Sequence, residues 1–251
     1  MADLFKGEIC TTAYAKFRLL HPDWIFDSIV DHCKDGCFLL AVDVGCGSGQ
    51  SCHRLCRHFR SVIGIDVSED QIKAAKSKYE KEITFRVGQA EDLSFLDEHT
   101  LDLLTAGVSM HWFDIPKFLQ EAKRVLKPGG VLAVYSYLMP RTDCPHVEAF
   151  YVELFKFMDS RTRHADEKYS NVDFPFLDVK RLEHVHAVDC TIDDFLGFLV
   201  SLSAWQKFTD QNQDAARKLE EKLREFYYDE KTGETRQMKM FYEYTLILCR
   251  K

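Results

Sequence analysis

Three glycines in a short stretch could bring the backbone close to a bound ligand. Gly45, Gly47 and Gly49 occupy alternate positions directly after an apolar run that contains Asp43. Glycine tolerates positive φ and has no Cβ, so such a chain can turn sharply and approach a ligand closely. A second carboxylate, Asp66, ends the next apolar run, seventeen residues after Gly49. The pattern predicts a nucleoside site in which Asp66 accepts hydrogen bonds from the ribose hydroxyls.

The glycine spacing differs from that of dinucleotide-binding proteins. Their fingerprint is G-x-G-x-x-G, whereas here the third glycine comes one position earlier and Gln50 follows it. The carboxylate of Asp43 would repel a pyrophosphate but would favour a ligand with a positive ammonium or sulfonium group. These residues therefore favour S-adenosylmethionine over NAD. An NAD(P)-dependent oxidoreductase on the same sheet is the alternative enzyme class.

Alternating strands and helices must position this site. We expect buried strands at residues 38–44, 61–66, 83–87, 101–106 and 131–135. Helices are expected between them, at residues 49–59, 68–78 and 115–126. Repeated strand–helix units predict an α/β fold with a parallel, doubly wound sheet that is covered on both faces. Ligands of such sheets bind beyond the carboxyl ends of the strands, where Asp43 to Gly49 and Asp66 would lie.

In the second half of the chain, strands and helices no longer alternate regularly. Beyond Pro140 we expect helices at residues 147–158, 195–205 and 214–227, and strands at residues 182–188 and 241–248. No linker or repeat separates the halves, so we interpret the chain as a single domain. Its expected parts are a helical lid (1–37), a cofactor-binding core (38–140), a cap and substrate region (141–235) and a closing strand (236–251).

The composition lowers the expectation for several classes of partner. The net charge is −7, from 33 basic and 40 acidic residues, whereas nucleic-acid binders usually carry a basic face. No apolar stretch is long enough for a membrane span, and no signal peptide is recognised at Met1, so we expect a cytoplasmic protein. The nine cysteines are expected to be reduced thiols rather than metal ligands, and Cys52 and Cys56 are spaced to pack on one helix.

Four successive segments resemble the motifs of class I S-adenosylmethionine-dependent methyltransferases. They are residues 43–49, 64–68, 88–93 and 126–130. Three further segments resemble the trans-aconitate methyltransferase-like group of small-molecule methyltransferases. They are residues 14–18, 111–114 and 203–205. The resemblance implies a Rossmann-like, seven-stranded sheet whose last strand is antiparallel, with a helical cap over the substrate.

The resemblance also implies a set of contacts to S-adenosylmethionine, which the reaction converts to S-adenosylhomocysteine. The Gly45–Gly49 loop would hold the methionine moiety, Gln89–Glu91 would flank the adenine, and Tyr14 and Arg18 would close over the cofactor. The expected cofactor-binding residues are Tyr14, Arg18, Asp43, Gly45, Cys46, Gly47, Gly49, Asp66, Val67, Gln89, Ala90, Glu91, Ala106 and Gly107.

Fewer residues are expected to bind the methyl acceptor than to bind the cofactor. A carboxylate acceptor is ionised at neutral pH and needs no base, whereas a hydroxyl or an amine needs one. His111 follows the fourth strand, where it could act as that base or only orient its loop. Arg141 could bind a carboxylate through its planar guanidinium group. Trp112 and Trp205 are expected to line the substrate pocket together with His111 and Arg141.

The sequence thus predicts a methyltransferase, monomeric or homodimeric, that acts on a small molecule at a carboxylate or hydroxyl oxygen. A non-catalytic module that binds S-adenosylmethionine and acts through a partner is a further alternative. The substrate itself is left open.

Overall fold

A computed structural model describes residue 17, residues 20–33 and residues 37–251 of the chain. Tyr14 and Arg18, two of the expected cofactor contacts, lie outside the described residues. Among the residues that are described, no helix is long and apolar enough to cross a membrane.

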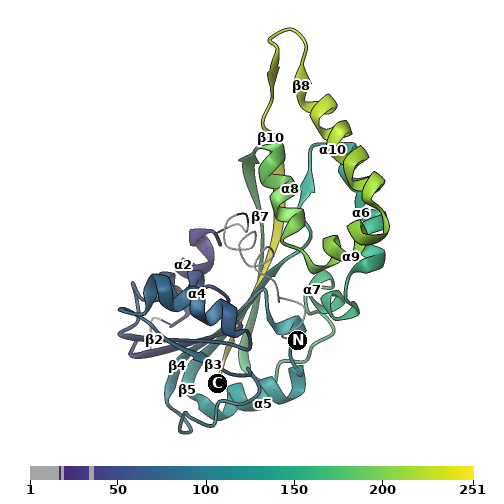
Figure 1. Cartoon of the computed structure of the whole chain (residues 1–251). Coiled ribbons are helices and arrows are strands. Elements are labelled where there is room, and N and C mark those ends of the chain that lie inside the picture. The colour runs from purple at the N-terminus through teal and green to yellow at the C-terminus, as the bar shows by residue number, and fades with distance from the viewer. Residues whose placement is uncertain (1–16, 18–19, 34–36) are drawn as a thin grey trace.

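Five parallel strands form one half of the sheet (Figure 1). In chain order they are β1 (Leu40–Val44), β2 (Ser61–Asp66), β3 (Thr84–Val87), β4 (Leu101–Gly107) and β5 (Leu126–Tyr137). They lie side by side in the order β3-β2-β1-β4-β5. The helices α3 (Gln50–Leu55), α4 (Glu69–Tyr79) and α5 (Ile115–Val125) connect three of these strands to their successors, as the alternating pattern predicted.

Both faces of the sheet are covered, because side chains of successive strand residues point to opposite sides. Ala41 and Leu103 belong to the apolar cluster beneath α2 (Asp23–Cys33), α3 and α4. Val42 and Leu104 belong to a second cluster, on the side of α5. All four side chains are fully buried. The continuous apolar runs that predicted these strands reflect this burial on both faces.

The other half of the sheet is antiparallel. The last strand, β10 (Met238–Arg250), lies between β5 and β7 (Leu177–Cys190) and runs antiparallel to both. The short β6 (Arg141–Thr142) pairs with the start of β10. This order confirms the Rossmann-like mixed sheet with an antiparallel last strand. A separate hairpin joins β8 (Tyr228–Asp229) and β9 (Glu234–Thr235).

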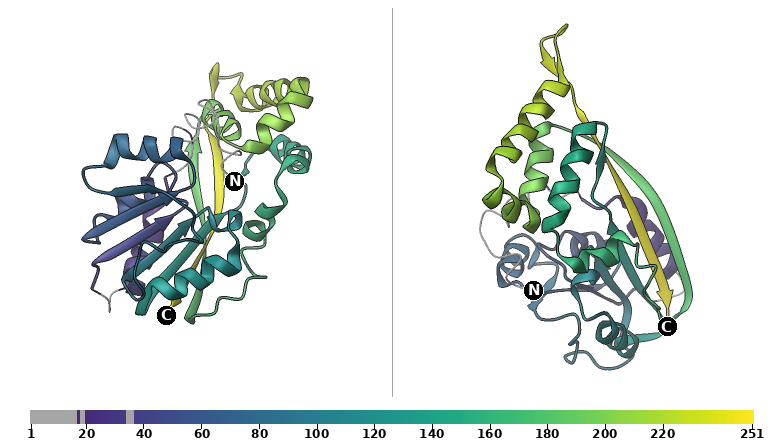
Figure 2. Two further views of the ribbon diagram at one scale, coloured as in Figure 1. Left: turned by 60° about the horizontal axis from the view of Figure 1, so that its bottom comes forward. Right: turned by 90° about the vertical axis from the view of Figure 1, so that its right-hand side faces the viewer.

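Four helices cluster at one end of the molecule, away from α4 and α5 (Figure 1). They are α6 (Pro145–Leu154), α8 (Ile192–Val200), α9 (Ser203–Gln211) and α10 (Gln213–Tyr227). Two 3₁₀ turns, η3 (Phe155–Phe157) and η4 (Ser160–Thr162), and the short α7 (Arg163–Asp166) lead back toward the sheet. Figure 2 shows the same cluster of helices beside the first half of β10.

Three elements differ from the sequence expectation. The strand expected at 182–188 extends over Leu177–Cys190, because β10 pairs with it along that whole length. The helix expected at 195–205 is two helices, and Ser201 and Leu202 separate them. The helix expected at 147–158 ends at Leu154, after which the chain tightens into η3.

Candidate functional site

The loop after β1 is a tight backbone turn. Gly45, Gly47 and Gly49 have φ values of 66°, 51° and 84°, a region that residues with a Cβ rarely adopt. A Cβ on Gly45 would lie 2.5 Å from the Cβ of Ser109, so the loops after β1 and β4 touch through this glycine. The glycines therefore allow the tight turn and also let the loops after β1 and β4 approach each other closely.

Asp66, at the end of β2, is tied to this loop. Its Oδ2 accepts a hydrogen bond of 2.9 Å from the amide of Gly47, and its Oδ1 accepts one of 2.9 Å from the amide of Ser68. Burial raises the pKa of this carboxyl, although the two amides favour its charged form. The side chain is thereby fixed at the mouth of a cavity.

This cofactor cavity lies at the carboxyl ends of the parallel strands. It is lined by Gly45, Gly47, Asp66, Val67, Gln71, Gly88, Ala90, Glu91, Gly107, Val108, Ser109, Trp112 and Phe113. Glu91 is fixed there because its Oε1 accepts a hydrogen bond of 2.6 Å from the amide of Asp114. The combination of a carboxylate at the end of β2 with exposed loop backbone fits a nucleoside.

Asp43 lies beneath the glycine loop and is almost fully buried. Thr105 Oγ1 donates a hydrogen bond of 2.7 Å to Asp43 Oδ1, and Cys52 Sγ donates one of 3.4 Å to Oδ2. Burial raises the pKa of this carboxyl to about 6. Asp43 and Cys46 line a small recess beside the cofactor cavity, and Gly45 and Gly107 line both spaces. A buried carboxylate in such a recess suits a cationic group.

Most of the sequence-predicted cofactor residues that the structure describes lie at these two spaces. Gly45, Gly47, Asp66, Val67, Ala90, Glu91 and Gly107 line the cofactor cavity, and Asp43 and Cys46 line the recess. Three others line neither. Gly49 faces the ring of Phe85, the side chain of Gln89 is exposed, and Ala106 is buried in the sheet beside α5.

Sequence reasoning missed five residues of the cofactor cavity. They are Gln71, Gly88, Val108, Ser109 and Phe113. Gly88 and Phe113 belong to segments that carried the family resemblance, so their positions offered a signal. Val108 and Ser109 follow the fourth strand directly, at the sheet edge where ligands of such folds bind, so their positions also offered a signal. Gln71 offered none, because its approach depends on how α4 folds back.

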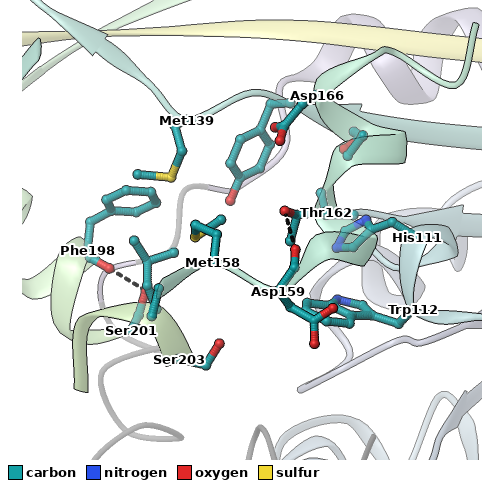
Figure 3. Close-up of a pocket in the computed structure, with 16 residues that line it drawn as sticks. His111, Trp112, Met139, Met158, Asp159, Thr162, Asp166, Phe198, Ser201 and Ser203 are labelled. Carbon is teal, nitrogen blue, oxygen red and sulfur yellow. Dashed lines mark hydrogen bonds between the residues drawn. The ribbon is translucent and has the colours of Figure 1, made fainter. Parts of the chain in front are cut away.

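A second cavity, the substrate cavity, adjoins the first and has a volume of about 110 Å³ (Figure 3). Val108 and Trp112 line both cavities, so the two meet just beyond β4. Val108 itself has a φ of 51°, which is unusual for a β-branched residue. Its amide donates a hydrogen bond of 2.7 Å to the carbonyl of Tyr135, which holds it in place.

The lining of the substrate cavity combines acidic, hydroxyl and apolar groups. Besides Val108, its residues are His111, Trp112, Ser136, Tyr137, Met139, Met158, Asp159, Thr162, Ala165, Asp166, Phe198, Ser201, Leu202, Ser203 and Ala204. In Figure 3, Met139 and Phe198 lie across the cavity from His111 and Trp112. Among the described residues, no Lys or Arg lines it.

His111, the candidate base, is buried at the edge of this cavity in the 3₁₀ turn η2 (Met110–Trp112). Its Nδ1 lies 3.2 Å from the hydroxyl of Tyr169, and its ring lies 4.8 Å from that of Trp112. Burial raises the pKa of Tyr169 far above its ordinary value, so its phenol stays neutral. When Nδ1 carries the proton and donates it to this hydroxyl, Nε2 is the basic nitrogen of the ring.

Two predicted substrate residues lie outside the cavity. Arg141 is on β6, where its guanidinium forms an ion pair of 2.6 Å with Glu243 of β10 and is 60% exposed. Trp205 packs against Phe150 and Phe208, with ring centroids 5.7 and 6.1 Å away. The two residues before it in its segment face the cavity instead, because one helical step turns Trp205 toward α6.

Comparison with known proteins indicates which enzymatic activity the chain has. Residues 42–134 match a family model described as a methyltransferase domain. The chain is 29% identical over 223 residues to a protein named as a methyltransferase from Dictyostelium discoideum, covering 86% of this chain and 83% of that protein. It is 28% identical to a structure described as a type II methyltransferase from Anaeromyxobacter dehalogenans, with a TM-score of 0.77 over 93% and 98% of the two chains.

These matches identify the chain as an S-adenosylmethionine-dependent methyltransferase with the Rossmann-like methyltransferase fold. The methyltransferase core is also 37% identical over 107 residues to a malonyl-[acyl-carrier protein] O-methyltransferase from Coxiella burnetii, covering 41% of this chain and 35% of that protein. The cofactor is S-adenosylmethionine, so the oxidoreductase alternative is wrong. The narrower resemblance to the trans-aconitate group stays a prediction.

The geometry of this methyltransferase fits its cofactor. A Cβ on Gly107 would lie 2.4 Å from Tyr135 Oη, so a larger residue would clash at this strand end, which lines the cofactor cavity and the recess. Asp66 faces the cofactor cavity, and Asp43 faces the recess. S-adenosylmethionine carries two hydroxyls on its ribose and a positive sulfonium and ammonium. Within the described part of the chain, no group of His, Cys, Asp or Glu could hold a metal ion.

Proposed function

We propose that this methyltransferase methylates a hydroxyl oxygen of a small molecule that is neutral or cationic. The observation that carries the proposal is the lining of the substrate cavity, where His111 lies with two acidic residues, Asp159 and Asp166. A carboxylate acceptor would have to approach Asp166, and no Lys or Arg among the described lining residues would face it there. Of the two oxygen acceptors that the sequence leaves open, the hydroxyl fits this cavity better.

The nearest guanidinium is already engaged. Arg161 donates hydrogen bonds of 2.9 and 2.7 Å to the two oxygens of Asp159, and it lies over the ring of Trp112 at 5.0 Å from the centroid. This ion pair lowers the pKa of the Asp159 carboxyl, so it stays charged at neutral pH. A second negative group brought by a substrate would compete with Asp159 for Arg161.

The proposed cofactor contacts are the described residues of the sequence prediction that line the two spaces. Asp66 would accept the ribose hydroxyls, Ala90 and Glu91 would flank the adenine, and Asp43 would face the methionine end. Gly107 would lie beside the sulfonium. The positions of these residues in the cofactor cavity and the recess support the assignment.

His111 has a defined part in this reaction. S-adenosylmethionine supplies an electrophilic methyl carbon and a sulfur that takes up the electron pair of the broken C–S bond. His111 would accept the hydroxyl proton as the new O–C bond forms, and Tyr169 would hold the imidazole ring in orientation. The walls of the substrate cavity place the acceptor in line with the methyl group and exclude water.

The proposal is tested with a radiolabelled methyl donor and matched sets of small phenols, alcohols, amines and carboxylic acids. We expect turnover of hydroxyl compounds, and we expect His111→Gln to lower kcat about 100-fold. Cofactor affinity, measured by calorimetry, should change less than about twofold, because His111 does not line the cofactor cavity.

Tyr169→Phe is the matched control, since it keeps the ring and removes the hydroxyl that contacts His111 and Ser136. It should lower kcat less than His111→Gln does. Turnover confined to carboxylic acids, with His111→Gln as active as the unmodified enzyme, would refute the hydroxyl assignment. Turnover confined to amines would support a neutral or cationic substrate but would show that nitrogen, rather than a hydroxyl oxygen, accepts the methyl group.

A further inference from the structure

β7 is the outermost strand of the sheet, and among the described residues its outer edge pairs with no other strand. The right-hand view of Figure 2 shows it as the long ribbon outside β10. Four apolar side chains along it are exposed: Leu177 (70%), Val179 (42%), Leu182 (38%) and Val185 (50%). A long edge of this kind offers its backbone amides and carbonyls to another strand, and native proteins usually protect it.

The two faces of β7 are partly engaged within the chain. On one face, the ring of His184 lies 5.3 Å from that of Trp24 in α2. On the other face, Arg181 donates hydrogen bonds to the carbonyls of Lys168 and Tyr169. These contacts hold the two faces of β7 within the chain. Among the described residues, no strand pairs with its outer edge, so that edge can pair with a partner.

We propose that β7 pairs antiparallel with β7 of a second copy of this chain, about a twofold axis at Leu182. In an antiparallel pair, residues at equal distances on either side of the axis face each other on the same side of the sheet. Leu182 would then face Leu182 of the second copy. Val179 would face Val185. A β-bulge at Asp178, whose φ is 46°, takes Leu177 out of the regular alternation, so three of the four exposed apolar side chains meet an apolar partner.

The charges of the strand favour the same register. Arg181 would face Glu183 on both sides of the axis, so opposite charges meet there. Lys180 would face His184, which opposes two positive charges only if that imidazole is protonated. The registers centred one residue away place Arg181 or Glu183 opposite itself, and like charges directly opposite destabilise a strand pair. The sequence of β7 therefore favours self-pairing in one register.

The pairing would join two eight-stranded sheets into one continuous sheet across the dimer. It lies on the side of the sheet opposite to β3, which forms the other edge. None of the residues of β7 lines the cofactor cavity or the substrate cavity, so the inference is independent of the proposed acceptor.

Sedimentation equilibrium of the full chain over the micromolar range tests the association. We expect a monomer–dimer equilibrium whose dissociation constant rises at least about 10-fold in Leu182→Lys, because two lysines would meet at the axis. Val87→Lys is the matched control. Val87 is 52% exposed on β3 at the opposite edge, and its replacement should leave the dissociation constant unchanged.

Cross-linking tests the register. In Leu182→Cys, two thiols would meet at the axis within reach of a disulfide bond, so copper-catalysed oxidation by oxygen should give a covalent dimer. Lys180→Cys, on the same face, should cross-link far less because it would face His184. A monomer at all concentrations would overturn the proposal. So would a dimer that Leu182→Lys leaves intact and Leu182→Cys does not trap.

Discussion

The cofactor cavity and the substrate cavity share Val108 and Trp112, yet they are built differently. The cofactor cavity takes most of its lining from the loops that follow β1 to β4, and glycines make up a large part of it. Besides the loop after β4, the substrate cavity takes side chains from the end of β5, the link between η3 and η4, η4 itself, α7, α8 and α9. A shared sheet thus fixes the cofactor, whereas separate helices shape the acceptor site. The acceptor can therefore change without disturbing the sheet.

The largest effect is expected from disturbing the end of β4 at Gly107, which lines the cofactor cavity and the recess but not the substrate cavity. Gly107→Val would drive a side chain into Tyr135, whose hydroxyl donates a hydrogen bond of 2.8 Å to Ser51 Oγ. We expect cofactor affinity, measured by calorimetry, to fall more than about 100-fold, since the strand end must move. Far-ultraviolet circular dichroism should confirm the fold. Full affinity in this variant would show that the strand end does not shape the cofactor cavity.

A second prediction concerns the buried charge in the cofactor half. Because the pKa of Asp43 is raised to about 6, the folded state binds its proton more tightly than the unfolded state does. Without cofactor, stability should therefore fall as pH rises from about 4 to 6, by roughly 2–3 kcal/mol. Asp43→Asn should remove this loss, so the variant unfolds at higher denaturant concentration at pH 7 but binds the cofactor more weakly. An unchanged pH dependence of urea unfolding would contradict this account.

The cap should show the opposite pH dependence and a smaller effect. Arg161 lowers the pKa of Asp159, so this pair stabilises the folded state above the ordinary pKa of aspartate. That contribution is lost as pH falls through about 4 and below. Both side chains are partly exposed, so Asp159→Asn should cost no more than about 1 kcal/mol at pH 7. Urea unfolding at pH 7 and pH 3 should show the difference from unmodified protein shrinking at the lower pH. A difference that grows on acidification would refute this.

The same contrast explains what the sequence could predict. Gly45, Gly47 and Asp66 follow buried strands directly, so local pattern was enough to place them at one edge of the sheet. Met139, Asp159 and Phe198 reach one cavity from three distant segments, and no local pattern indicates that they meet. Such convergence depends on tertiary packing, which periodicity does not encode.

Two errors have a similar cause. Arg141 was expected to bind substrate, but β6 pairs with β10 and brings it to Glu243, a residue far along the chain. The length of β7 was underestimated because its outward residues alternate little between apolar and polar, and its extent follows from pairing with β10. In both cases a strand that comes late in the chain decides the position of an earlier segment.

The central place of β10 has a consequence for protein synthesis. The five parallel strands need only residues up to about 137 to find their partners, so they can assemble while the ribosome is still translating the rest. β7, completed at Cys190, has no neighbour until residues 238–250 have emerged and inserted beside β5. During that interval both edges of β7 are unpaired, and its exposed apolar residues are open to neighbouring nascent chains. Folding of this enzyme is therefore vulnerable to aggregation between the synthesis of β7 and the synthesis of β10.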